Sequence, residues 1–221
     1  MNSETPIIWT EGLMGAGKTK FVRKIAELLG FFAIEEPVDT NFYLADFYKD
    51  QQKYAFGMQM LLLHHRYAMK QAAVFLAARC VYPGIILDRS IAGDKTFAGM
   101  HRDAGNINAL DWRCYEFAYK MMARTIQPPT LMIYLRVQPE TAFVRMQERD
   151  RKEEAGVPLK YLQALYDHYE NLIYEIKQGV SPWGRQMVVH EIIYDKGVHE
   201  EDEWRIIAKS INDICDRQRR A

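Results

Sequence analysis

The sequence carries no net charge, because 29 lysines and arginines are balanced by 29 aspartates and glutamates over 221 residues. A chain without a basic excess has no general attraction for nucleic acid or for an anionic membrane surface. We therefore expect neither nucleic acid nor membrane as a partner. Any recognition of anions must come from a local group of cations.

Cysteine is scarce, and Cys80, Cys114 and Cys215 are widely spaced. An odd number without a Cys-x-x-Cys pair argues against a disulfide framework and against a zinc site. We expect three free thiols that are buried in the core.

Long apolar runs are missing as well. None reaches the length of a membrane span, and the first residues, MNSETP, lack a basic segment followed by an apolar one. We therefore expect a cytoplasmic protein. Internal repeats and Gly/Ser linkers are also absent, and the length suits one domain with a sizeable core. A single domain is predicted over residues 1–221.

The sequence does contain a phosphate-binding pattern near its start. EGLMGAGKTK includes G-x-x-x-x-G-K-[ST], between the apolar run PIIWT and a segment with helical periodicity. In a strand–loop–helix of this kind, backbone N–H groups surround phosphate oxygens, lysine adds a charge, and the threonine hydroxyl can ligate Mg²⁺. An ordinary glycine turn is the alternative. The predicted phosphate ligands are Gly12, Leu13, Met14, Gly15, Ala16, Gly17, Lys18 and Thr19.

Apolar runs and periodic segments alternate along the chain. The predicted strands are Ile7–Thr10, Phe31–Ile34, Gly84–Asp88, Leu131–Arg136 and Met187–Ile193. The predicted helices are Lys18–Leu29, Tyr54–Ala78, Ala109–Ile126, Pro139–Arg149, Leu159–Gln178 and Glu201–Arg217. Such alternation predicts an α/β fold, in which helices cover both faces of a parallel sheet. Ligands then collect beyond the carboxyl ends of the strands.

Charged residues follow the second and third predicted strands. EEP begins with Glu35 and Glu36, and DRS begins with Asp88 and Arg89. A carboxylate can take the proton of an acceptor hydroxyl, a second acid can hold Mg²⁺, and an arginine can reach phosphoryl oxygens. Solvated turn acids and a structural Asp–Arg pair are the alternatives.

Three arginines lie close together in RMQERDRKEE, at Arg145, Arg149 and Arg151. Beside a phosphate loop, such cations can close over the charge of a phosphoryl-transfer transition state. A solvated helix end with alternating charges is the alternative.

Two polar residues interrupt the apolar stretch AFGMQMLLLHHRYA on the long predicted helix. Gln59 and Arg66 are seven residues apart and therefore lie on nearly the same helix face. They either point into a ligand cavity or form the solvent-facing side of the helix.

Taken together, these motifs resemble the deoxyribonucleoside kinase family, which includes deoxycytidine, deoxyguanosine and deoxyadenosine kinases. The resemblance runs from the glycine loop to about Asn171, through EGLMGAGKT, EEPV, FYKDQQKYAFGMQ, DRSIAGD, RMQERDRKEE and VPLKYLQAL. It implies a P-loop kinase fold with a five-stranded parallel sheet and an arginine-rich lid at about residues 145–156. Relatives form dimers through a helical bundle, so a homodimer is expected.

By position, the resemblance also implies roles in the chemistry. Glu36 corresponds to the general base beside the 5′-hydroxyl, and Arg89 to an arginine of the same region. Asp88 and Thr19 correspond to residues near Mg²⁺, and Lys18 to the catalytic lysine of the glycine loop. The lid arginines over the ATP phosphates correspond to Arg145, Arg149 and Arg151.

For the nucleoside, the resemblance assigns Tyr48 and Glu154 to the 3′-hydroxyl and Gln59 to the base edge. Met58 stands where several relatives carry an aromatic ring, and Phe97 could supply one instead. The expected nucleoside-binding residues are Glu36, Tyr48, Met58, Gln59, Arg66, Arg89, Asp94 and Glu154.

The expected activity is phosphorylation of a deoxynucleoside 5′-hydroxyl by ATP with Mg²⁺. An Asp94 carboxylate kept ionised by Arg66 only accepts hydrogen bonds, so a purine deoxynucleoside or deoxycytidine is expected to be favoured over thymidine. A nucleoside monophosphate kinase and a nucleotide-binding switch without turnover are the alternatives.

Overall fold

The protein is described by a computed structural model for residues 5–36, 41–151, 154, 156–184, 187–197 and 200–220. Pro37 of the EEP motif and Lys152, Glu153 and Ala155 of the predicted lid lie outside these residues.

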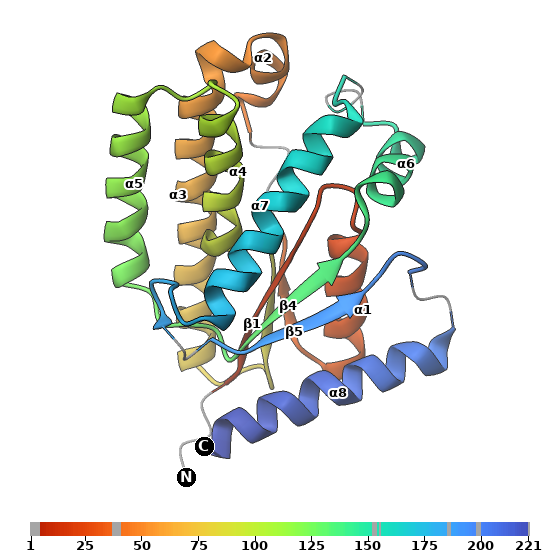
Figure 1. Ribbon diagram of the computed structural model, residues 1–221. Coiled ribbons are helices and arrows are strands. Elements are labelled where there is room, and N and C mark those ends of the chain that lie inside the picture. The colour runs from red at the N-terminus through yellow and green to blue at the C-terminus, as the bar shows by residue number, and fades with distance from the viewer. Residues whose placement is uncertain are drawn as a thin grey trace.

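A five-stranded sheet forms the centre of the molecule (Figure 1), and every strand pair in it is parallel. The strand order is β2-β3-β1-β4-β5. The strands are β1 (Ile7–Gly12), β2 (Phe32–Ile34), β3 (Ile85–Asp88), β4 (Leu131–Arg136) and β5 (Val189–Ile193). The α/β fold and the parallel sheet predicted from the sequence are confirmed.

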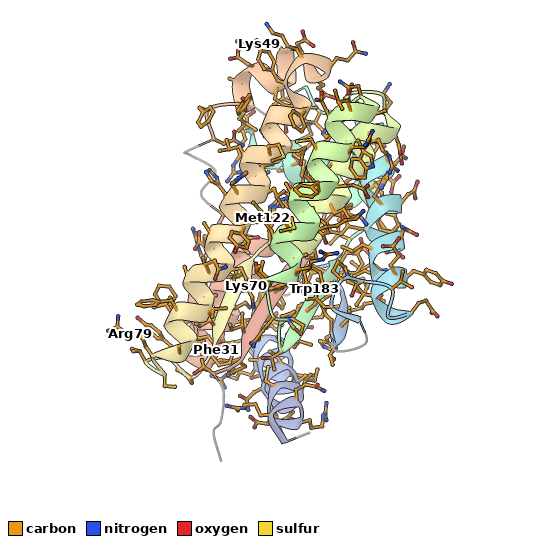
Figure 2. The ribbon with its side chains drawn as sticks, turned by 90° about the vertical axis from the view of Figure 1, so that its left-hand side faces the viewer. Phe31, Lys49, Lys70, Arg79, Met122 and Trp183 are labelled. Carbon is orange, nitrogen blue, oxygen red and sulfur yellow. The ribbon has the colours of Figure 1, made fainter. Side chains whose placement is uncertain are left out.

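Helices cover the two faces of the sheet, as right-handed crossovers require. Helices α1 and α8 pack together on one face, whereas α3, α4, α5 and α7 form the layer on the other (Figure 1). Figure 2 views this second layer from outside, with α3 and α5 side by side in front. The helices are α1 (Lys18–Leu29), α2 (Leu44–Lys49), α3 (Gln51–Ala78), α4 (Ile91–Asp103), α5 (Ala109–Arg124), α6 (Pro139–Arg149), α7 (Leu159–Lys177) and α8 (Glu201–Arg220).

Two of these helices, α2 and α4, were not predicted from periodicity. Helix α2 has six residues, too few to show a repeating apolar face. From Ile91 to His101, every residue of α4 except Lys95 is buried, so the helix has no polar face and no amphipathic pattern. It begins at Ser90, whose hydroxyl accepts a hydrogen bond from the Ala92 N–H at 3.1 Å.

The structure tests the expectation that all three cysteines are buried. Cys215 is buried, but Cys80 and Cys114 are exposed, so the expectation of buried thiols was wrong for these two. Among the described residues, no helix combines the length and the apolar character needed to cross a membrane.

Candidate active site

The carboxyl ends of β1, β2 and β3 open into a cavity of about 960 Å³. Its lining includes residues of the glycine loop, Glu36 after β2, and Asp88 and Arg89 at the end of β3. These strands are neighbours in the sheet, so motifs about 70 residues apart meet at one edge.

The glycine loop has the shape that a phosphate requires. Gly15 has a φ of +74°, and a Cβ there would lie 2.2 Å from the Ala142 carbonyl oxygen of α6. A larger residue at this position would therefore push α6 away from the loop. Lys18 folds back over the loop, because its Nζ donates to the carbonyl oxygens of Gly12 at 3.1 Å and Leu13 at 2.7 Å.

Lys18 is buried at the base of this loop. Burial, reinforced by the nearby positive charge of Arg89, lowers the pKa of the Lys18 ammonium group to about 7. A bound anion would supply the missing counter-charge and favour the charged lysine.

Thr19 and Asp88 form a place for a metal ion. The Thr19 hydroxyl donates to Asp88 Oδ2 at 2.6 Å. The other oxygen, Asp88 Oδ1, is buried without a hydrogen-bond partner. A hydroxyl beside an unpartnered carboxylate oxygen is the donor set that Mg²⁺ accepts next to phosphates, so these residues fit the ion.

Glu36 lies between two arginines. Its Oε1 accepts from Arg66 Nε at 3.0 Å and Nη2 at 2.8 Å, and its Oε2 accepts from Arg89 Nε at 2.8 Å. Burial by itself would raise the pKa of Glu36, but the two guanidinium groups outweigh it and hold that pKa at about 2. The carboxylate is therefore ionised at every working pH.

Glu35, the other acid of the motif, has a different environment. It also lines the cavity, but its side chain is 36% exposed and forms a bidentate ion pair with the exposed Arg23, with both hydrogen bonds at 2.6 Å. Of the two acids, only Glu36 is held by buried cations.

The opposite end of the cavity has apolar walls and one amide without a partner. Gln59 and Arg66 are each 2% exposed and line the cavity, so they do not form the solvent-facing side of α3. Gln59 Oε1 is buried without a hydrogen-bond partner. Met58 and Phe97 also line this space, and the Phe97 ring lies under the guanidinium groups of Arg66 and Arg89.

The predicted pairing of Asp94 with Arg66 is confirmed, and the predicted contact of Asp94 with a nucleoside stays a prediction. Arg66 Nη1 donates to Asp94 Oδ1 at 2.5 Å, and the Tyr115 hydroxyl donates to Oδ2 at 2.6 Å. Both oxygens are used, and Asp94 is fully buried behind Arg66, outside the cavity lining. Burial raises the pKa of Asp94 to about 6 against the opposing effect of Arg66, which leaves it ionised at neutral pH.

The three arginines of the α6 end separate in the structure. Arg149 and Arg151 line the cavity and form ion pairs with Glu154, which also lines it together with Tyr48. Arg145 points elsewhere, because its Nη2 donates to the carbonyl oxygens of Tyr194 at 3.0 Å and Asp195 at 2.6 Å. In this arrangement, Arg145 is not part of the cavity lining, and its predicted contact with the ATP phosphates stays a prediction.

The sequence reading assigned no role to several residues of the site. Phe47 and Tyr161 line the cavity, and a fully buried Glu11 lies just outside it. Tyr161 belongs to the VPLKYLQAL motif, and Glu11 is the first residue of EGLMGAGKTK, so the signal for both was their position inside a recognised motif. Phe47 lies on α2, a helix that periodicity missed.

One cavity at the edge of the parallel sheet contains the glycine loop, the Thr19–Asp88 pair and the ionised Glu36 carboxylate. This combination is typical of a P-loop phosphotransferase. A family model described as deoxynucleoside kinase matches residues 8–216. The chain therefore belongs to the deoxynucleoside kinase family and is a kinase. This match extends well beyond Asn171, where the recognised motifs ended.

Individual relatives agree with this family. The chain is 35% identical to a deoxyadenosine kinase of Dictyostelium discoideum, over 76% of this chain and 67% of the relative. It is 36% identical to a deoxyguanosine kinase of the same organism, of which it spans 63%. A deoxyadenosine/deoxycytidine kinase of Bacillus subtilis (strain 168) is 33% identical over 76% of each chain.

A solved structure has the same fold. The deoxyadenosine kinase from M. mycoides with bound dATP superposes with a TM-score of 0.77 and 28% identity, covering 94% of this chain and 99% of that one.

The lowered pKa of Lys18 predicts proton uptake when an anion fills the glycine loop. At about pH 8, a lysine with a pKa of about 7 is mostly neutral, so binding of tripolyphosphate should be accompanied by proton uptake at Lys18. Lys18→Arg keeps its charge at this pH and should lack this uptake. Calorimetry in two buffers of different ionisation enthalpy measures the difference, and equal uptake by both proteins would contradict the assignment.

Proposed function

We propose that the protein transfers the γ-phosphoryl group of ATP to the 5′-hydroxyl of a 2′-deoxyribonucleoside. The observation that carries the proposal is the ionised Glu36 carboxylate, which shares one cavity with the glycine loop and the Thr19–Asp88 pair. A carboxylate at the acceptor end suits an uncharged hydroxyl. Membership of the deoxynucleoside kinase family supports the same acceptor class.

Glu36 acts as the general base in this proposal. It accepts the proton of the 5′-hydroxyl as the oxygen attacks phosphorus. Arg89 Nε donates to Glu36 at 2.8 Å and would therefore lie beside an acceptor hydroxyl that is bound to this carboxylate. A carboxylate with a low pKa is a weak base, but it is deprotonated at the start of every turnover. Phosphoryl transfer has a loose transition state, in which little of the proton needs to have been transferred.

The donor end supplies positive charge. Lys18 and the N–H groups of the glycine loop hold the β- and γ-phosphates, and Arg149 and Arg151 reach over them from the cavity wall. Thr19 and Asp88 would hold Mg²⁺, which neutralises charge on the phosphate oxygens when it is bound.

The nucleoside end supplies hydrogen bonds. Gln59 presents an amide to the base, with the Met58 and Phe97 side chains as apolar walls. Tyr48 and Glu154 recognise the 3′-hydroxyl. The named relatives act on deoxyadenosine, deoxyguanosine and deoxycytidine, which supports a purine deoxynucleoside or deoxycytidine over thymidine.

A monophosphate acceptor fits the site less well. It would bring a second phosphate dianion to the acceptor end, next to the ionised Glu36. The arginines at this end, Arg66 and Arg89, are already neutralised by Glu36 and Asp94. A nucleoside monophosphate kinase is therefore the weaker alternative.

A substrate panel tests the function. With ATP and Mg²⁺, kcat/KM should be lowest for thymidine among the four natural deoxynucleosides. A 2′,3′-dideoxynucleoside should have a kcat/KM about 10- to 100-fold lower than its parent, because Tyr48 and Glu154 would lack the 3′-hydroxyl that they bind. Monophosphate formation measured by chromatography decides both points. No product from any deoxynucleoside contradicts the proposed function, and efficient use of thymidine contradicts the proposed selectivity.

The role of Glu36 has a matched control in its neighbour. Glu36→Gln keeps the size of the side chain and loses its basicity, so kcat should fall by about 10²- to 10⁴-fold. Glu35→Gln removes the adjacent acid, which is paired only with the exposed Arg23, and should leave kcat within about twofold. Steady-state kinetics of the two variants are compared at saturating substrates. Near wild-type kcat in Glu36→Gln would remove Glu36 from the mechanism.

We further propose that the protein is a homodimer joined through the outer surface of α3 and α5 (Figure 2). Leu110, Phe117 and Met121 of α5 and Phe75 of α3 are 49–73% exposed there, which is unusual for large apolar side chains of adjacent helices.

Matched charge insertions test this interface. Phe117→Asp should give a monomer by sedimentation equilibrium, because it places a carboxylate in the apolar contact. Ile206→Asp on α8, an equally exposed residue at 69%, should remain a dimer. A wild-type monomer, or dissociation of both variants alike, would exclude this interface.

A further inference from the structure

Arg89 has a backbone conformation that needs support. Its φ is +74°, in the left-handed region that a branched or long side chain rarely adopts, and its N–H donates to the Thr10 carbonyl oxygen at 2.9 Å. A residue stays in such a conformation only when its surroundings fix it. The side chain it projects is the one that contacts Glu36.

A buried carboxylate holds the residue that follows. Glu11, fully buried at the end of β1, accepts from both the N–H and the hydroxyl of Ser90 through Oε1, each at 2.7 Å. Helix α4 packs directly on it, since a Cβ at Gly93 would lie 2.2 Å from Glu11 Oε2. Glu11 therefore fixes the turn immediately after Arg89 and the first turn of α4.

The second oxygen of Glu11 holds the side chain of the same arginine through a tyrosine. Tyr169 of α7 donates its hydroxyl proton to Glu11 Oε2 at 2.9 Å and accepts from Arg89 Nη1 at 3.2 Å. Tyr169 is fully buried, and burial raises its pKa well above the usual value, so it keeps the proton that it donates. Glu11 thus restrains Arg89 at both its backbone and its guanidinium group.

We propose that Glu11 and Tyr169 are positioning residues that fix Arg89 against Glu36, although neither lines the cavity. The inference rests on the proposed function and extends it. The geometry required at Glu36 depends on Arg89, and a displacement of about 1 Å at a reacting group can cost on the order of 100-fold in rate. Removing the tyrosine hydroxyl should therefore slow catalysis without removing any group from the cavity.

Tyr134 provides a control for loss of a buried tyrosine hydroxyl. Its ring stacks on that of Tyr169, with 5.9 Å between the ring centroids, and both residues are fully buried. The Tyr134 hydroxyl donates to Glu170 at 3.1 Å and not to a partner of Arg89. Tyr134→Phe and Tyr169→Phe make the same chemical change in the same aromatic pair. Only the second removes a partner of Arg89.

The experiment is a double-mutant cycle in kcat and KM on the full chain. Tyr169→Phe should lower kcat by about 10- to 100-fold with KM for both substrates nearly unchanged, whereas Tyr134→Phe should stay within about twofold. In an Arg89→Met background, Tyr169→Phe should cost less than about twofold, because the residue it positions is gone. Glu11→Gln, which can keep the contacts of Oε1 with Ser90 but replaces the acceptor of the Tyr169 hydroxyl by an amide NH₂ group, should behave like Tyr169→Phe in both backgrounds.

The outcomes separate the two levels of inference. If wild-type protein phosphorylates no deoxynucleoside, the proposed function fails. If the wild type is active but Tyr169→Phe matches Tyr134→Phe, or its loss of kcat persists unchanged without Arg89, then Glu11 and Tyr169 are structural only and the positioning role is overturned.

Discussion

The rest of the site depends on one buried interaction, the Glu36 carboxylate held between the guanidinium groups of Arg66 and Arg89. Three ionised groups in a cavity wall lose much of their hydration, and that loss is offset only if each has partners at good geometry. The structure provides such partners in an alternating series. Asp94 lies behind Arg66, and Glu11, through the Tyr169 hydroxyl, lies behind Arg89. Removing any one member would take a hydrogen-bond partner from a neighbouring buried group.

This charge series also explains why so many elements meet at one point. Glu36 follows β2, Arg66 comes from α3, Arg89 ends β3, and Asp94 comes from α4. The strand order β2-β3-β1 brings the carboxyl ends of these strands together, so the first crossover connections already deliver the charged residues to one edge. The hydroxyls of Tyr115 and Tyr169 then tie α5 and α7 to the same cluster. The contacts that pack the helical layer therefore also place the reacting groups.

The features that could be predicted from the sequence are those that a local pattern of residues determines. The glycine loop, the parallel sheet and the acids after β2 and β3 follow from motif and periodicity, because each depends on only a few neighbouring residues. The direction in which a side chain points depends on tertiary packing, which a local pattern does not encode. The Asp94 oxygens accept from Arg66 and Tyr115 outside the cavity lining, and Arg145 donates to backbone carbonyls that follow β5. Periodicity did not predict helix α4, because the helix is buried on nearly every side and lacks the polar face that gives an amphipathic pattern.

The low pKa of Glu36 raises a question about its strength as a base, and the arrangement of its partners supplies the physical answer. A carboxylate with a pKa of about 2 attracts a proton weakly, and that value arises because two guanidinium groups face it in the absence of phosphate. Phosphate oxygens would compete for the Arg89 donors, since Arg89 lies in the cavity with the glycine loop. Each N–H that turns from Glu36 to a phosphate removes part of the stabilisation of its charged form, so the pKa of Glu36 rises and its basicity increases. If Glu36 is the proposed base, its basicity would therefore be greater with a phosphoryl donor beside it than with both arginines turned fully toward it.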